Sequence, residues 1–283
     1  MDKEQMIAML NKDLAEEHAA VIRYLVHGYL EGEDSPLGAG LLSRAREEMW
    51  HIHWLGMIIG KLGGEPNLKP AAYPYDPSSR KTIFKSYVDY ELSLIPHYLR
   101  EADSVDDPHI KRVLQREAWE SEIHARKFAR VHDRLSQEEA AGIPAADNKL
   151  SQAFLHSLQQ LVEVKYNQML RAVRDAWVFQ DQGLSGWRIM DFSFTKMKQL
   201  AHLAEKVAEN GVEAKFQAGS WSASASIAIA LRNALEDLEK SHNLYLKLKS
   251  DPEIQQHAGL MINLDLALKQ EAYEIDEIRD WLK

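Results

Sequence analysis

Apolar residues recur at intervals of three and four along almost the whole 283-residue chain, and no stretch alternates apolar with polar residues as a half-buried strand does. This periodicity predicts an all-α protein. We expect helices over about 3–29, 36–62, 81–105 and 109–135, and again over about 150–179, 184–210, 220–249 and 252–283. In the first half the connections are short, long and short, which is typical of a four-helix bundle with one crossover.

The polar, alanine-rich stretch 137–148 interrupts the helical pattern with a glycine and a proline. It predicts a domain boundary between one four-helix bundle at 1–136 and a second at 149–283. Short segments recur in the same order in both halves at offsets of 144 to 154 residues, which indicates a duplicated unit. Examples are Glu17 with Glu163, Asp107-Pro108 with Asp251-Pro252, and 117–120 with 271–274.

Composition narrows the class of protein. Hydrophobic residues make up 45% and charged residues 27% of the chain, as in an ordinary globular protein. The formal net charge of −9 argues against a nucleic-acid partner. The absence of cysteine excludes disulfides and thiolate metal sites. No window resembles a membrane span or a signal peptide, so we expect no membrane partner and a cytoplasmic location.

Acidic residues occupy the wrong face of all four helices in the first half. On each helix a carboxylate interrupts the apolar seam near mid-length, where a core residue is expected. In the antiparallel hairpins these positions fall at matching depth, because each residue of a helix adds about 1.5 Å. The residues concerned are Glu17, Glu48 with His51, Glu91, and Glu117 with Glu120, and His124 continues the last seam.

Several carboxylates in one buried pocket are costly and repel one another unless cations bind them. Two divalent cations would carry four positive charges against the five negative charges of the glutamates. Oxygen ligands with one imidazole suit iron or manganese better than a closed structural zinc site. A single inward glutamate is more often paired with an arginine, and a lone histidine is more often a core residue. Acids on four helices together favour a metal centre.

The residues around these positions resemble the ferritin-like superfamily, in particular bacterioferritin and rubrerythrin. The similar segments are 10–17 with Tyr24, Glu48-Met49-Trp50-His51 followed by 62–68, and 113–117. The resemblance implies two tandem ferritin-like bundles and a site with two iron ions, manganese being the alternative. It implies that Glu17, Glu48 and His51 bind one ion, that Glu91, Glu117 and Glu120 bind the other, and that Glu48 and Glu117, or their partners, bridge.

The chain departs from the family pattern at several positions. Where the family often has a second Glu-x-x-His, this chain has Glu117-x-x-Glu120, so His124 is either an alternative ligand or a partner of one. Pro96 is expected to kink the third helix one turn past Glu91. Met49 matches the haem-ligand position of bacterioferritin, but methionine at a helix seam is usually packing, so haem is not expected.

The second half lacks the ligand pattern, so we expect it to be degenerate. Lys196 and Gln199 align with Glu48 and His51, and we predict that a salt bridge between Glu163 and Lys196 replaces metal there. A second site remains an alternative, built from His202, Glu236, Glu239, Glu271 and Glu274. The expected role of this half is structural: it covers the surface that family members use to dimerise, which would make the chain a monomeric pseudo-dimer or a small homo-oligomer.

The preferred functional expectation is an oxidoreductase of the di-iron oxidase or peroxidase type that reacts with O2 or hydrogen peroxide, with an unidentified electron donor. Tyr24 is then a candidate redox residue, with core packing as the alternative. A second expectation is a protein that binds or oxidises ferrous iron without cage storage. A third is a metal-free helical interaction module.

Overall fold

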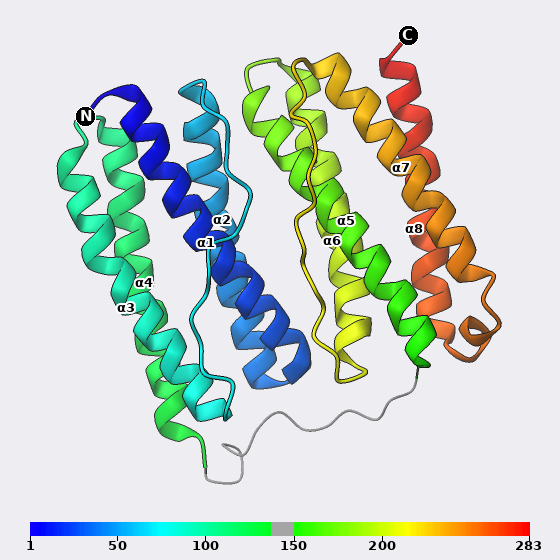
Figure 1. The fold of residues 1–283 in the computed structure, drawn as a ribbon, viewed down its shortest axis with the longest axis horizontal. Coiled ribbons are helices and arrows are strands. Elements are labelled where there is room, and N and C mark those ends of the chain that lie inside the picture. The colour runs from blue at the N-terminus through cyan, green and yellow to red at the C-terminus, as the bar shows by residue number, and fades with distance from the viewer. Residues whose placement is uncertain (137–149) are drawn as a thin grey trace. The chain divides into compact units, whose positions relative to one another are not determined.

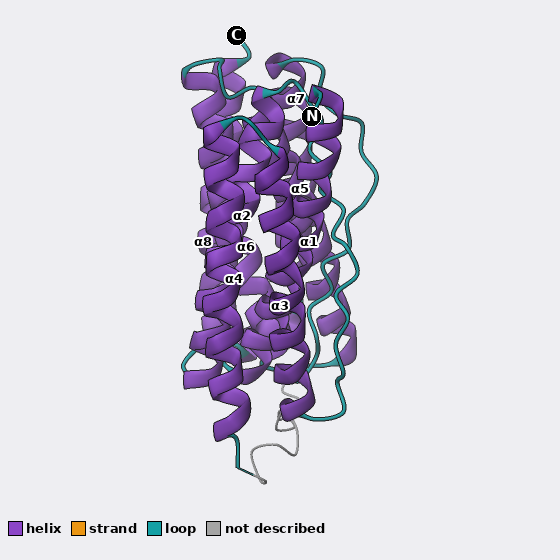
Figure 2. Ribbon diagram, turned by 90° about the vertical axis from the view of Figure 1, so that its left-hand side faces the viewer, coloured by secondary structure: helices purple, strands orange, loops and turns teal. Residues whose placement is uncertain are grey.

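We describe residues 1–136 and 150–283 of a computed structural model of the chain. In these ranges the chain forms eight α-helices, one short 3-10 helix and no strand. Figures 1 and 2 show long helices joined by loops. The chain divides into two compact units, Met1–Ala145 and Ala146–Lys283. The predicted boundary at 137–148 lies outside the described residues. None of the described helices is both long enough and apolar enough to cross a membrane.

The first unit contains four long helices. α1 packs along α2, and α3 packs along α4. Figure 1 shows the connection from α2 to α3, residues 62–79, running along the length of the unit. Two short turns and one long crossover therefore join the helices, as the pattern of the sequence predicts. The helices are α1 (Lys3–Glu31), α2 (Pro36–Lys61), α3 (Arg80–Ser104) and α4 (Pro108–Arg134).

Side chains at the helix ends explain why these helices begin and end where they do. Asp2, Ser35, Ser79 and Asp107 each accept a hydrogen bond from a backbone N–H of the first turn of α1, α2, α3 and α4 respectively. α1 ends at Gly32, whose φ of 84° is a conformation that favours glycine. Local capping chemistry therefore sets the helix boundaries to within a residue or two of those predicted.

A close approach between α1 and α2 also depends on glycine. A Cβ atom on Gly38 would lie 2.0 Å from the backbone oxygen of Gly32 and 2.8 Å from that of Gly28. Any side chain at this position would force the two helices apart. Glycine thus allows the tight turn that holds the facing sides of α1 and α2 in register.

The second unit contains four helices and one shorter element. α5 packs along α6, and α7 along α8. The helix predicted from about 220 begins instead at Ile227, because Ser226 caps it by accepting from the N–H of Ile229. The helix predicted over 252–283 is divided, since Pro252–Gln256 forms the 3-10 helix η2. The α-helices are α5 (Gln152–Val178), α6 (Leu184–Ala208), α7 (Ile227–Lys249) and α8 (Ala258–Trp281).

Candidate metal centre

Six of the seven predicted ligands are buried in the interior of the first unit. Each is at most 2% exposed, and together they come from all four helices at mid-length. α3 continues through Pro96, and its glutamate reaches the interior with the others. The buried set is Glu17, Glu48, His51, Glu91, Glu117 and His124.

Five of these side chains form two groups that share Glu48. The first group joins Glu17, Glu48 and His51, and the second joins Glu48, Glu91 and His124; in each, the candidate ligand atoms lie within 4.8 Å of one another. His51 Nδ1 lies 2.8 Å from Glu48 Oε2, whereas His124 Nδ1 lies 2.6 Å from Glu48 Oε1. The two oxygens of one carboxylate thus face two different histidines, which is the position of a bridging ligand.

The outer nitrogens of both histidines contact further carboxylates. His51 Nε2 lies 2.6 Å from Glu120 Oε2, and His124 Nε2 lies 2.6 Å from Glu47 Oε2. An Nε2–H that donates outward leaves the Nδ1 lone pair free for a cation, and such a partner orients a metal-binding imidazole. Both inward-facing nitrogens are therefore Nδ1 atoms.

Glu120 does not join the inner cluster predicted for it. It accepts from Arg116 Nε at 2.9 Å, and its side chain remains 14% exposed. It acts as a partner of His51, while His124 occupies the inner position on α4. Glu47 was not predicted. It lies four residues before His51, as Glu120 does before His124, and this shared spacing is the signal that would have identified it.

Two tyrosines form reciprocal hydrogen bonds between α1 and α3 with the glutamates of the cluster. Tyr98 of α3 donates its hydroxyl hydrogen to Glu17 Oε1 of α1. Tyr24 of α1 donates to Glu91 Oε1 of α3 at 2.6 Å. Tyr24 also packs in the core, with its ring centroid 5.1 Å from that of Phe128. Tyr98 occupies Oε1 of Glu17 and leaves Oε2 to face His51, whereas Tyr24 donates to the same Glu91 oxygen that lies 3.5 Å from His124 Nδ1.

Glu117 differs from the other members of the cluster in its hydrogen bonding. Its side chain is fully buried, and among the described residues neither carboxylate oxygen has a hydrogen-bond partner. Burial raises the pKa of Glu117 well above its usual range; the imidazole of His51 opposes this, and the charges of Glu17 and Asp13 add to it. A buried carboxyl group without a partner indicates a site for a proton or a cation.

Burial and neighbouring charges also shift the pKa values of the other buried groups in the cluster. Burial raises the pKa of Glu17 to about 8, with the charge of Glu48 adding to the shift. Although burial opposes it, the charges of Glu48 and its neighbours raise the pKa of His124 to about 12. Those of Glu17 and Glu48 likewise raise the pKa of His51 well above its usual range. Without a cation, protons neutralise the cluster, and a metal ion would displace them.

The donor set and its spacing fit divalent cations. The distances from His51 Nδ1 and His124 Nδ1 to the facing glutamate oxygens range from 2.6 to 3.5 Å. Two ligands at right angles with bonds of about 2.1 Å lie about 3.0 Å apart. Carboxylate oxygens with imidazole nitrogens suit iron and manganese. The residues present therefore fit two metal ions that share Glu48.

The two histidine-bearing helices differ at one buried position. Carboxylate-bridged bundles use a Glu-x-x-His pair on each of two helices. α2 supplies Glu48 and His51, but three residues before His124 α4 carries Ser121, which is also buried. A second bridging carboxylate at that position is therefore missing, and Glu117, one turn earlier on α4, is the remaining inward acid.

In the second unit, lysine ammonium groups occupy the positions beside the buried glutamates where metal ions could otherwise bind. Lys165 pairs with Glu271, and Lys196 Nζ lies 2.6 Å from Glu274 Oε2; all four side chains are buried. The predicted pairing of Lys196 with Glu163 was wrong. Glu163 is only half-buried, and Lys165, two residues later, is the inward residue.

The alternative second site does not form either. His202, Glu236 and Glu239 are exposed, while Glu271 and Glu274 are neutralised by the two lysines. Among residues 150–283 the structure brings together no group of three acidic or histidine side chains that could hold an ion. Each buried acid in the interior of this unit therefore has a fixed cation of its own.

Comparison with known proteins adds no family to this description. No protein-family profile matches the chain, and no curated protein matches it at a significant level. The structure is an all-helical bundle with buried Glu/His clusters that could hold metal ions. Membership of the ferritin-like superfamily remains a prediction from the sequence.

Proposed function

We propose that the first unit binds two iron or manganese ions and acts as an oxidoreductase that reduces O2 or hydrogen peroxide. The observation that carries this proposal is the position of Glu48, whose two oxygens face the Nδ1 atoms of His51 and His124. A shared carboxylate between two Glu/His groups is the arrangement that holds two metal ions at bridging distance.

Bound between these residues, the two ions would supply electrons and open coordination positions for the oxidant. The chain contributes orientation. Tyr98 holds one oxygen of Glu17 while the other faces His51, and Tyr24 holds the oxygen of Glu91 that faces His124. Glu120 fixes the ring of His51 from outside. These hydrogen bonds preorganise the ligands, which reduces the cost of rearrangement when charge changes at the site.

Glu117 is suited to handle protons. Reduction of O2 or peroxide consumes protons, and the site is closed to bulk water at this residue. Burial raises the pKa of Glu117 well above its usual range, so its carboxyl group holds a proton more readily than a solvated glutamate does. We therefore assign Glu117 the role of proton donor to the reduced oxygen product. Tyr24 remains a candidate redox residue, since its hydroxyl lies 3.1 Å from that of Tyr73.

The test begins with metal-free protein loaded anaerobically with Fe(II), in which bound iron per chain and the rate of oxidation by O2 and by hydrogen peroxide are measured. The variant Glu48→Ala with His51→Ala should lose two ions relative to the wild type and lose turnover. The matched control is Glu163→Ala with His202→Ala in the second unit, which should change neither.

Each outcome decides between functions. Iron that stays bound through repeated oxidation supports an oxidoreductase, whereas ferric iron released after each oxidation would mean that iron is the substrate. Full loading of the Glu48 and His51 variant contradicts the assignment of the centre. A wild-type chain that binds no Fe(II) would favour a metal-free helical module.

A further inference from the structure

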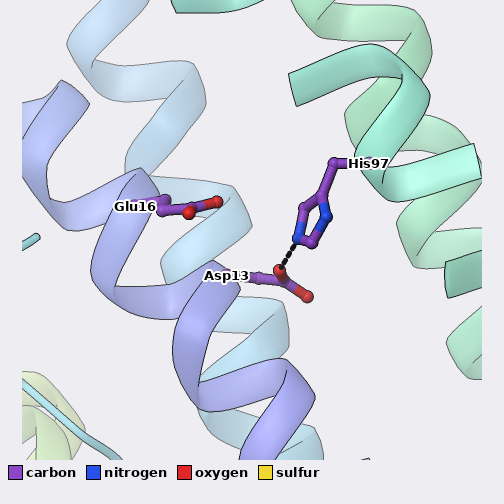
Figure 3. Close-up of side chains that lie close together, drawn as sticks. All are labelled: Asp13, Glu16 and His97. Atoms are coloured by element: carbon purple, nitrogen blue, oxygen red, sulfur yellow. Dashed lines mark hydrogen bonds and ion pairs between the residues drawn. The ribbon is translucent and has the colours of Figure 1, made fainter. Parts of the chain in front are cut away.

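A second polar cluster lies in the first unit on the α1 and α3 side, apart from the centre described above. Figure 3 shows Asp13 and Glu16 of α1 directed toward the ring of His97 on α3. Their candidate ligand atoms lie within 4.8 Å of one another. Glu101, one turn after His97, joins them, with its Oε1 3.1 Å from His97 Nε2. None of these residues belongs to the Glu48 cluster.

A proton on His97 Nε2 satisfies its two carboxylate contacts but not its contact with Lys12. Its Nε2 lies 3.0 Å from Asp13 Oδ1 and 3.1 Å from Glu101 Oε1, and both oxygens require a donor at that nitrogen. Lys12 Nζ lies 3.4 Å from the same Nε2 and would require an acceptor there. A ring nitrogen can donate one hydrogen or accept one, but not both. A cation between the nitrogen and the two oxygens would remove this conflict.

Several buried carboxylate oxygens of this cluster lack an N–H or hydroxyl donor among the described residues. The side chain of Asp13 is 0% exposed, and among the described residues no N–H or hydroxyl donor reaches its Oδ2; its hydrogen bond with the carboxyl group of Glu101 requires a shared proton. Within residues 1–136 and 150–283, Oε2 of Glu16 and Oε2 of Glu101 also have no N–H or hydroxyl donor. Burial raises the pKa of Asp13 to about 7, although the hydrogen bond with Glu101 and the charge of Lys12 oppose the shift. Such orphaned buried oxygens require an ion, a proton or an ordered water.

The ammonium group of Lys12 lies on the outer side of the cluster. Lys12 Nζ lies 3.6 Å from Glu16 Oε1, and its side chain is 59% exposed. Within the described contacts it does not reach the buried Oδ2 of Asp13. Three carboxylates thus face one exposed ammonium and one imidazole. The helix spacings, three residues on α1 and four on α3, place each pair on one face.

We infer that Asp13, Glu16, His97 and Glu101 bind one divalent transition-metal cation, at a site separate from the dinuclear centre. Distances of 3.0 and 3.1 Å between donor atoms match the roughly 3.0 Å edge of a site with bonds of about 2.1 Å. Three carboxylates and one imidazole favour Mn²⁺ or Fe²⁺. Lys12 occupies the mouth in the absence of the ion and swings into solvent when the ion binds.

The first experiment measures Mn²⁺ bound per full-length chain by equilibrium dialysis, with pulsed EPR to detect nitrogen coordinated to Mn²⁺. Replacing His97 by Gln, or Asp13 by Asn, should remove one Mn²⁺ per chain, and His97→Gln should remove the corresponding nitrogen coupling. His109→Gln is the matched control, because His109 is an exposed histidine on the first turn of α4. Unchanged stoichiometry and affinity in both His97→Gln and Asp13→Asn would overturn the inference.

A second variant should increase the affinity for Mn²⁺, whereas the first variants should reduce it. Lys12→Met removes a competing positive charge, so Mn²⁺ should bind on the order of fivefold more tightly at this site. A network of ion pairs alone would show no such gain, and unchanged or weaker binding overturns the inference. Lys12 is exposed, so this variant folds even if Asp13→Asn does not.

The same measurements in a Glu48→Ala, His51→Ala background separate this site from the dinuclear centre. One Mn²⁺ sensitive to His97→Gln should persist there, whether or not the centre has the proposed function. Loss of that ion together with the other two would overturn the separateness of the site.

Discussion

Replacing Glu120 by Gln tests whether a carboxylate outside the cluster controls the cluster. Glu120 Oε2 lies 2.6 Å from the outer nitrogen of His51. The substitution preserves size but removes the charge that holds the Nε2–H tautomer, and thus weakens the inward Nδ1 as a ligand. Loss of such partners typically lowers metal affinity 10- to 100-fold, about 1.4–2.7 kcal/mol.

The structure places Glu120 at the lower end of this range. Arg116 also binds Glu120 at 2.9 Å and already offsets part of its charge. The carboxylate is 14% exposed, so solvent screens it slightly. We therefore expect about a tenfold loss of affinity. Glu47, the equivalent partner of His124, is 38% exposed and is paired with Arg44 at 2.6 Å, so Glu47→Gln should have a smaller effect.

The assay is competition for Mn²⁺ between the full chain and a chelator of known affinity, with urea unfolding of the metal-free forms as a check on folding. The matched control is Glu122→Gln, because Glu122 lies on the same helix, also pairs with an arginine and makes no contact with the histidines among the described residues. The reasoning is refuted if Glu120→Gln retains wild-type affinity, or if Glu122→Gln weakens binding equally.

Three further predictions concern stability. Tyr98→Phe removes the donor to Glu17 and should lower the free energy of unfolding by about 1 kcal/mol in urea, with a several-fold loss of Mn²⁺ affinity; unchanged affinity would contradict its orienting role. In metal-free protein, burial raises the pKa of Glu17 to about 8 and of Asp13 to about 7, so at these two carboxyls the folded state binds more protons than the unfolded state between pH 5 and 7, which outweighs the opposite effect of His18, whose pKa burial lowers to about 4. Stability to urea should therefore fall as pH rises, by up to about 1.4 kcal/mol per pH unit for each proton, and a rise would refute this. Lys196→Met alone should cost about 3–5 kcal/mol by leaving Glu274 buried and unpaired, whereas Lys196→Met with Glu274→Leu should recover most of it in the same assay; equal losses would contradict the pairing.

The helices of the first unit were predictable because their ends depend on local chemistry. Ser35, Ser79 and Asp107 cap within one turn, and such bonds require no knowledge of distant residues. The start of α7 was not predicted, since the alternating Ser/Ala residues before Ser226 are compatible with a helix by composition. The choice among several serines as the cap depends on packing that the local pattern does not contain.

The pairing of charges in the second unit could not be predicted for a different reason. Glu163 matches Glu17 as an acid in similar surroundings, but an offset of two residues turns a side chain to another face of a helix. Lys165 lies 148 residues after Glu17, and Lys196 lies 148 residues after Glu48. A constant offset thus identifies the inward lysine, whereas matching by residue type selected the half-buried glutamate.

The first unit carries a shorter internal repeat that would have located the outer carboxylates. In α1 and α3 a glutamate precedes its tyrosine by seven residues, and the two helices exchange hydrogen bonds. In α2 and α4 a glutamate precedes the histidine by four residues, and these helices exchange contacts too. The matched residues are Glu17 and Tyr24 with Glu91 and Tyr98, and Glu47 and His51 with Glu120 and His124.

This half-unit repeat fails at one inner position, where Glu48 corresponds to Ser121. A symmetric cluster would carry a second bridging carboxylate there, and its histidines would face equivalent partners. With serine instead, His124 Nδ1 faces Glu48 at 2.6 Å and Glu91 only at 3.5 Å, while Glu117 approaches from the side of His51 and Glu17. The two proposed metal positions would therefore be chemically unequal. The ion near His124 would have fewer carboxylate ligands, and we expect the oxidant to bind there.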